Sequence, residues 1–222
     1  MFEAADISAF FLTIRLALTA TLILLLIGMP VAWWLAKSQW RFKYMLEAII
    51  ALPLVLPPTV LGFYLLLLLG ANGPFAAITG TTLAFSFTGL VIGSVIYSLP
   101  FVIQPLQDTF QAIGTRPMEV AATLRASPRD RFLTVALPLA RPGFITASVL
   151  GFAHTLGEFG VVLMIGGNIP GQTRVLSIAI FDHVESLDYG SAHWLAGSLL
   201  VLSFIMLAVV YATNKRFRVF RL

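Results

Sequence analysis

The chain has 222 residues, of which 59% are hydrophobic and 11% are charged, and its mean hydropathy is +0.93. Soluble domains carry about 25% charged residues, so this composition excludes a soluble protein and predicts a membrane protein. The net charge of +4 does not indicate nucleic-acid binding, because the basic residues gather beside apolar segments. The absence of cysteine excludes a disulfide framework and a cysteine metal site.

Apolar segments long enough to cross a bilayer as helices, which takes about 20 residues, recur along the chain. The first covers about residues 8–36, with Trp33 and Trp34 as an expected interfacial anchor. Because the N-terminus lacks the basic region of a cleavable signal peptide, we expect this segment to remain in the membrane. The segments are too long and too poorly alternating for the strands of an outer-membrane barrel, so helices are the expected spanning elements.

Prolines interrupt the second and third segments, at about 45–69 and 88–113. Pro57 and Pro58 lie in the second segment, and the third contains two more prolines. A proline removes a backbone donor and clashes with the preceding helical turn. In a bilayer, such breaks persist where neighbouring helices or a water-filled path satisfy the freed carbonyl groups. Pro57 and Pro58 are therefore candidates for a pathway or gate.

A polar, basic island over about residues 115–138 separates the third and fourth segments. It reads as two short helices. Pro117 is suited to the start of the first, and Ser127 is suited to cap the second, with Asp130 three residues later. Glu119 falls in the first turn of the first helix, where the helix dipole favours an anion. Taken alone, this pattern also fits an amphipathic surface hairpin with solvated charges.

The fourth segment, at about 139–165, contains one acid, Glu158, between Gly157 and Gly160. An unpaired charge in hydrocarbon is expensive, so such a residue is functional or paired. We expect a structural or gating role in which Glu158 pairs with His154, four residues earlier, or with a polar group on a partner helix. The alternatives are direct contact with a transported anion, which a carboxylate would repel, and a solvated position near the outer end of the segment.

Residues 173–187 are apolar at first but turn acidic within about fifteen residues. We expect an outer-surface or re-entrant helix there rather than a sixth span, and a fifth span at about 193–212. Three clusters hold 12 of the 14 Lys and Arg residues and follow the first, third and fifth segments. The positive-inside rule places them in the cytoplasm, so we expect a periplasmic N-terminus and a cytoplasmic C-terminus. The clusters are Lys37, Arg41 and Lys43; Arg116, Arg125, Arg129, Arg131 and Arg141; and Lys215, Arg216, Arg218 and Arg221.

The spacing within the island resembles the EAA loop of permease subunits of bacterial ABC importers. That loop reads Glu-Ala-Ala, three residues, Gly, nine residues, Ile, one residue, Leu-Pro. Here residues 119–121 fill the triplet, Val135 takes the Ile position and Arg125 replaces the glycine. Because glycine at a helix end usually supplies a left-handed residue, we expect the turn one or two residues later, at Ser127. The resemblance implies a cytoplasmic hairpin that docks on an ATPase subunit through Glu119, Val120, Ala121, Leu124, Arg125, Ser127, Leu137 and Pro138.

Residues 52–64, 157–160 and 167–174 narrow the resemblance to the permeases of molybdate/tungstate importers, with sulfate/thiosulfate permeases as close relatives. It implies the type I ABC importer permease fold, with about five transmembrane helices in one domain over residues 1–222, in the inner membrane. It also implies a homodimer that binds two ATPase subunits and one periplasmic molybdate-binding protein and passes molybdate or tungstate between its two copies. The residues expected beside that path are Pro57, Pro58, Gly157, Glu158, Phe159 and Gly160.

No P-loop motif and no pairing of a nucleophile with a base is present in the sequence. We therefore expect ATP hydrolysis by a separate subunit, and neither a catalytic site, a cofactor nor a metal site in this chain. A secondary transporter would require inverted repeats and ion-coupling residues within the membrane, and a membrane-embedded enzyme would require a cluster of catalytic residues. Some members of the family carry a C-terminal domain that binds the substrate, and we expect this chain to lack it because it ends directly after its last apolar segment.

Overall fold

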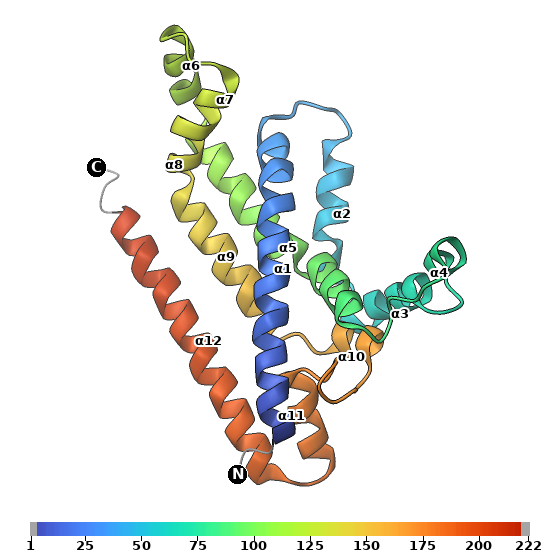
Figure 1. Cartoon of the computed structure of the whole chain (residues 1–222). Helices are drawn as coiled ribbons and strands as arrows, with labels where there is room; N and C mark the ends of the chain where they lie inside the picture. The colour runs from blue at the N-terminus through green and yellow to red at the C-terminus, as the bar shows by residue number, and fades with distance from the viewer. Residues whose placement is uncertain (1–3, 219–222) are drawn as a thin grey trace.

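The computed structural model in Figure 1 describes the backbone of residues 4–218 and the side chains of residues 4–212. Every regular element in this part of the chain is a helix, which confirms the all-α prediction. The side chains of the last basic cluster, at 215–221, lie outside the described residues. The elements are α1 (Ala4–Lys37), α2 (Lys43–Val55), α3 (Pro58–Leu69), α4 (Pro74–Thr79), α5 (Phe87–Ile113), α6 (Arg116–Thr123), α7 (Pro128–Asp130), the π-helical segment η1 (Arg131–Ala136), α8 (Leu137–Leu139), α9 (Arg141–Leu156), α10 (Gly160–Gly166), α11 (Leu176–Glu185) and α12 (Tyr189–Arg218).

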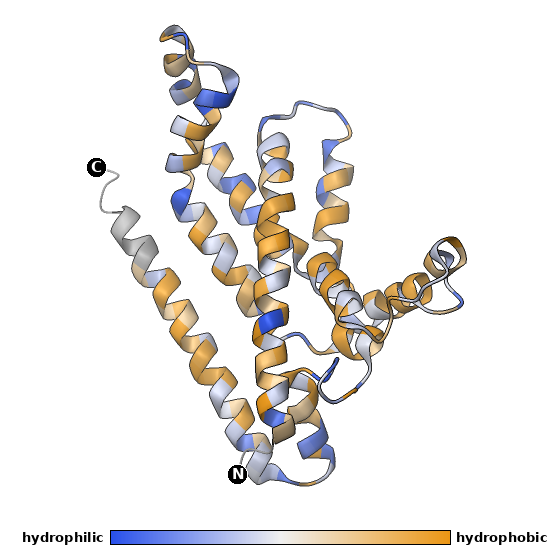
Figure 2. Ribbon diagram, in the orientation of Figure 1, coloured by the Kyte–Doolittle hydropathy of each residue, from blue (hydrophilic) through white to orange (hydrophobic). Residues whose placement is uncertain are grey.

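Four stretches of the described chain are long and apolar enough to cross a membrane, namely α1, α3 with α4, α5, and α12 to Ala212. A fifth span results if Pro128–Leu139 and α9, which meet at an angle of 67°, are counted as one bent element. Figure 2 shows mostly hydrophobic residues along these helices and a mixture of hydrophilic and hydrophobic ones on the hairpin formed by α6, α7 and η1. The structure therefore has four or five spans, in agreement with the expected number of about five.

The second apolar segment, expected as one span over 45–69, is broken into α2 and α3. Leu56 and Pro57 are both extended, with ψ angles of 135°. Both precede a proline, and the proline ring disfavours the helical conformation of the residue before it. Figure 1 shows α2 roughly aligned with α1, where it packs on α5, while α3 leaves at a steep angle toward α4. The predicted break at Pro57 and Pro58 is therefore present, but the segment is not one continuous span.

The fourth apolar segment is also not continuous. Helix α9 ends at Leu156, the next three residues are non-helical, and α10 covers only Gly160–Gly166. By contrast, Pro100 and Pro105 lie within an unbroken α5, so the expected interruption of the third segment is wrong. The Thr109 hydroxyl donates to the carbonyl of Pro105 four residues earlier, a local bond that threonine commonly makes within helices.

The central bundle consists of α1, α5 and α9, which pack on one another along much of their length. Small residues permit the close contact. A Cβ atom added at Gly151 of α9 would lie 2.6 Å from Val102 of α5, and one added at Gly28 of α1 would lie 3.3 Å from the same residue. Membrane helices associate through such small residues, because lipid offers no hydrophobic drive for their packing.

Helix α11 fills the place of the expected outer-surface or re-entrant helix. Its ten residues extend about 15 Å, which is half of the hydrocarbon thickness, so it does not cross the bilayer. It packs against α1 and α12. The amide of Leu176 donates to the Thr13 hydroxyl (2.7 Å), and His183 lies 3.0 Å from Asp6 of α1. These contacts attach α11 to the first turns of α1.

Candidate functional site

The residues predicted to couple to an ATPase lie on a hairpin formed by α6, α7 and η1, at the same end of the molecule as the C-terminus (Figure 1). The sequence explains the start of its second helix. The amide of Asp130 donates to the Ser127 hydroxyl (3.2 Å), and the amide of Ser127 donates to the Asp130 carboxylate (3.3 Å). This reciprocal pair is the capping box expected from the spacing.

The turn after α6 lies at the position where the resembling motif has glycine. Arg125 adopts a φ angle of 62°, in the left-handed region. The amide of Arg125 donates to the carbonyl of Ala122 (3.0 Å), and the amide of Ala126 donates to that of Ala121 (3.1 Å). These two bonds form a Schellman motif with arginine in place of glycine. The expectation that the turn would move to Ser127 is therefore wrong, and Arg125 itself makes the turn.

The predicted coupling residues separate into two groups. Glu119, Val120, Ala121, Leu124, Arg125 and Ser127 lie at the tip, whereas Leu137 and Pro138 lie in α8 at its base. Apolar side chains at the tip face outward, since Val120 is 62% and Leu124 is 79% exposed. Exposed apolar residues within a polar segment are typical of a surface that contacts another protein.

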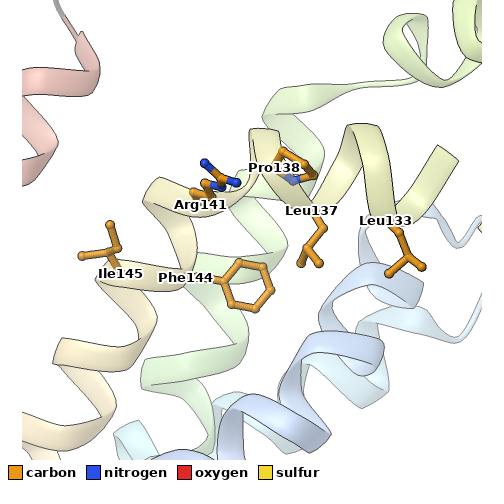
Figure 3. Close-up of a pocket in the computed structure, with 6 residues that line it drawn as sticks. All are labelled: Leu133, Leu137, Pro138, Arg141, Phe144 and Ile145. Atoms are coloured by element: carbon orange, nitrogen blue, oxygen red, sulfur yellow. The ribbon is translucent and has the colours of Figure 1, made fainter. Parts of the chain in front are cut away.

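The base of the hairpin borders an apolar cavity of about 410 Å³. Figure 3 shows Leu137 and Phe144 pointing toward one another across the bend between α8 and α9, with Arg141 on the outer side. Ala140 forms the corner of this bend. The residues that line the cavity are Leu133, Leu137, Pro138, Arg141, Phe144 and Ile145.

An aromatic cluster joins the hairpin to the bundle. The ring of Trp33 on α1 lies 4.9 Å from that of Phe132 on η1 and 5.0 Å from that of Phe110 on α5, both edge-to-face. Such pairs stabilise by about 0.5–1.5 kcal/mol beyond their buried area. The sequence suggested only an interfacial role for Trp33, because nothing in a single sequence pairs it with residues about 80 and 100 positions later.

The two stretches predicted to line a pathway meet at a cavity of about 560 Å³. Pro58 and the adjacent Thr59, at the α2–α3 break, face the α9–α10 break across it. Pro57 is not among the residues that line it. Tyr97 of α5, which the sequence did not single out, also contributes. The cavity is lined by Pro58, Thr59, Tyr97, Ala153, His154, Gly157, Glu158, Phe159 and Gly160.

Glu158 is 4% exposed, and its carboxyl group interacts with the Ser94 hydroxyl of α5, although no hydrogen bond of good geometry reaches its two oxygens in the described residues. The expected pairing with His154 is wrong. The Nδ1 atom of His154 lies 2.9 Å from the Ser98 hydroxyl, and its ring stacks on Phe101 at 3.8 Å. The backbone of Glu158 is fixed, because its carbonyl accepts a hydrogen bond from the Ser177 hydroxyl of α11 (2.6 Å). The chain therefore holds this carboxyl group in place without a charged partner among the described residues.

Two glycines explain how α3 and α10 come together beside this cavity. A Cβ atom added at Gly160 would lie 2.8 Å from Cβ of Pro58, and one added at Gly62 would lie 2.7 Å from Cβ of Met164. Side chains never approach so closely, so both positions require glycine for the observed packing. The close approach of α3 to α10 thus depends on Gly160 and Gly62, while Gly157 has no close neighbour from another element.

The chain resembles known proteins over almost its whole length. The family model described as "Binding-protein-dependent transport system inner membrane component" matches residues 25–219. The chain belongs to this family. It is 58% identical over 214 residues to the molybdenum transport system permease protein ModB of Azotobacter vinelandii, with 95% of each chain covered. It is 31% identical to the sulfate transport system permease protein CysT of Salmonella typhimurium, covering 95% of this chain and 77% of the relative.

Solved structures of ABC importers share the fold of this permease. The MetNI methionine transporter, described in inward-facing conformations, superposes with a TM-score of 0.73 at 16% identity, covering 97% of this chain and 99% of the other. A bacterial alginate transporter in complex with an alginate-bound periplasmic protein gives a TM-score of 0.77 at 14% identity, covering 97% and 80%. The chain is thus a multi-pass inner-membrane subunit of an ABC importer, with the type I permease fold predicted from its sequence.

Proposed function

We propose that this permease imports molybdate, and tungstate with little discrimination, across the inner membrane. The substrate assignment rests on sequence identity. The chain is 58% identical to the molybdenum permease of Azotobacter vinelandii but 31% identical to the sulfate permease of Salmonella typhimurium. Sulfate is the second candidate, because other sulfate permeases reach 34% identity, close to the 35% of a more distant molybdenum permease.

The hairpin at 115–138 couples this transport to ATP in the proposed mechanism. Its tip presents Val120 and Leu124 to a separate ATPase subunit, and its base continues through the bend at Ala140 into α9. Two ATPase subunits that close on ATP would draw the hairpins of two copies together and so move the helices to which they are joined. This coupling requires two conformations whose populations the nucleotide shifts.

The path runs between two copies of the chain, and a periplasmic molybdate-binding protein delivers the oxyanion to it. The solved complex of an alginate transporter with a periplasmic protein supports this kind of partner. At the breaks at Leu56-Pro57 and at 157–159, backbone N–H and C=O groups lack helical hydrogen bonds within apolar segments. Such groups are tolerated inside a membrane where they line a cavity. In this arrangement Glu158 contributes to a gate and does not bind the anion.

The experiment that tests the substrate uses proteoliposomes with the permease, its ATPase and a molybdate-specific binding protein. We expect ATP-dependent uptake of molybdate and tungstate at similar rates. Because few cations lie along the spans, selectivity resides in the binding protein, and replacing it by a sulfate-specific one that still docks should redirect transport. Robust sulfate uptake without molybdate uptake, with the native binding protein, would establish the sulfate alternative.

A further inference from the structure

A third, smaller cavity of about 220 Å³ lies where the hairpin rests on the end of α1. It is separate from the cavity at Glu158 and from the apolar one in Figure 3, with which it shares no residue. Three elements of the hairpin and one transmembrane helix form its wall. The lining residues are Trp33, Lys37, Met118, Pro128, Arg131 and Phe132.

Two cations face this cavity without an anion. Lys37 of α1 and Arg131 of η1 repel one another electrostatically, and neither forms a salt bridge with a described residue. The Nε atom of Arg131 is buried and lacks a hydrogen-bond acceptor in this part of the structure. A buried donor without a partner is costly, so an acceptor at this position would stabilise the protein.

The nearest acid in sequence is engaged elsewhere. Asp130, beside Arg131, accepts hydrogen bonds from the amide and hydroxyl of Ser127 in the capping box. The ammonium group of Lys37 lies 3.7 Å above the Trp33 ring. The contact with the ring occupies one side of the ammonium group and leaves its other side open to an anion.

We propose that this cavity binds a tetrahedral oxyanion, either as a free ion or as the phosphate of a lipid headgroup. The planar guanidinium of Arg131 matches the oxygens of such an anion, and the ammonium of Lys37 adds a point charge. The volume admits one anion with a few waters, since a water occupies about 30 Å³ in the liquid. The position also suits a lipid phosphate, because Trp33 and Lys37 end a transmembrane helix, where basic pockets meet headgroups.

Binding there has a structural consequence. The anion removes the repulsion between Lys37 and Arg131 and connects α1 directly to η1. It therefore fixes the base of the hairpin on the bundle, beside the aromatic contact between Trp33 and Phe132. This site acts on the element proposed to couple to the ATPase, but its existence does not depend on which substrate the permease carries.

The first arm of the test measures thermal unfolding of delipidated, detergent-purified permease in sodium phosphate or sodium molybdate, against sodium chloride of equal ionic strength. The variants are Arg131→Gln and Lys37→Gln. Arg129→Gln is the matched control, because it removes one exposed charge from the same hairpin outside the cavity. We expect wild type and Arg129→Gln to be stabilised with the same apparent Kd, and Arg131→Gln and Lys37→Gln to bind at least about tenfold more weakly.

The second arm identifies a lipid source by native mass spectrometry of permease purified with its membrane phospholipids. Retention of an anionic phospholipid by wild type and Arg129→Gln, and its loss from Arg131→Gln and Lys37→Gln, would assign the phosphate to a lipid. Phosphates and sulfates also stabilise proteins generally, so equal stabilisation of all four proteins together with equal lipid retention would overturn the proposal. Lys37→Gln, at an exposed position, keeps the test decisive if Arg131→Gln fails to fold.

Discussion

At the scale of single residues, Arg125 shows how far a backbone motif tolerates a change in its preferred residue. The two hydrogen bonds of the Schellman motif are present although its left-handed position holds arginine. An L-residue in this conformation loses roughly 1–2 kcal/mol relative to the right-handed one, and glycine does not. The hairpin therefore keeps its turn at the expense of local stability.

Arg125→Gly should slow hydrogen exchange of the two backbone amides in the turn, those of residues 125 and 126, by about fivefold. This change corresponds to roughly 1 kcal/mol of local stability. Arg125→Val should accelerate it, because a β-branched residue is poorly tolerated at positive φ. Hydrogen exchange of the purified permease, read by mass spectrometry on the hairpin peptides, measures both. Equal exchange in wild type and the glycine variant would show that arginine carries no strain here.

Glu158→Leu should raise the unfolding temperature of the purified permease while it lowers uptake. The substitution removes a buried carboxyl group whose oxygens make no hydrogen bond of good geometry in the described residues, and such a group destabilises by about 1–3 kcal/mol. Uptake should fall, because an acidic residue that destabilises the protein from within an apolar segment is expected to have a function. Glu158→Gln is the control, and it should change stability little. A lower unfolding temperature for Glu158→Leu would reveal a bonding partner in the assembled transporter.

At the scale of elements, short sequence patterns predicted where the helices form, whereas contacts between distant residues determine the direction in which the helices run. Runs of apolar residues, the Pro57-Pro58 pair and the Ser127 cap act within a few positions, so the number of spans, the hairpin and its second helix were predicted. The direction of α3 depends on its contact with α10, about 100 residues later. The pairing of His154 with Ser98 joins residues 56 apart. A single sequence contains no signal for either contact, and the expected pairing of Glu158 with His154 failed for this reason.

The α3–α10 contact should be sensitive to one methyl group. Gly62→Ala would place a Cβ atom 2.7 Å from Met164, and we expect a loss of about 1–3 kcal/mol of stability. Gly197→Ala on α12 is the matched control, since no atom lies within 4 Å of its added Cβ, and it should be neutral or stabilising. Chemical denaturation in detergent compares the two. Equal stabilities would show that α3 shifts freely on α10.

The hairpin should couple the ATPase cycle to the movement of the spanning helices. Glu119→Ala combined with Ala121→Arg should abolish uptake while the protein stays in the membrane, because both residues lie on α6, outside the spanning helices. An immunoblot of membranes measures how much of the variant is present, and the ATPase activity of the assembled complex is measured separately. Together the two measurements distinguish uncoupling from misfolding. Normal uptake by the double variant would exclude this hairpin as the coupling element.

At the scale of the whole molecule, the two ends of the chain lie at opposite ends of the bundle, and the hairpin lies at the end with the C-terminus (Figure 1). This arrangement agrees with an odd number of spans. It does not assign either end to a compartment, so a periplasmic N-terminus and a cytoplasmic hairpin and C-terminus remain a prediction from the basic clusters.

Single cysteines test that orientation directly, since the chain has none of its own. Asp188→Cys lies between α11 and α12, and Arg129→Cys lies on the hairpin, and both positions are exposed. An impermeant maleimide added to intact spheroplasts should label Asp188→Cys alone, and both should react after lysis. Labelling of Arg129→Cys from outside would reverse the topology.

The contact of α3 with α10 also has a consequence for biosynthesis. Gly62 leaves the ribosome about 100 residues before Met164, the residue against which it packs. At about 5–20 residues per second, this interval lasts on the order of 5–20 s. During that time α3 and α4 are synthesised and apolar, but their packing partner does not yet exist. The insertion machinery or the lipid must therefore hold this segment until α10 arrives, so α3 reaches its final tilt as one of the last steps of folding.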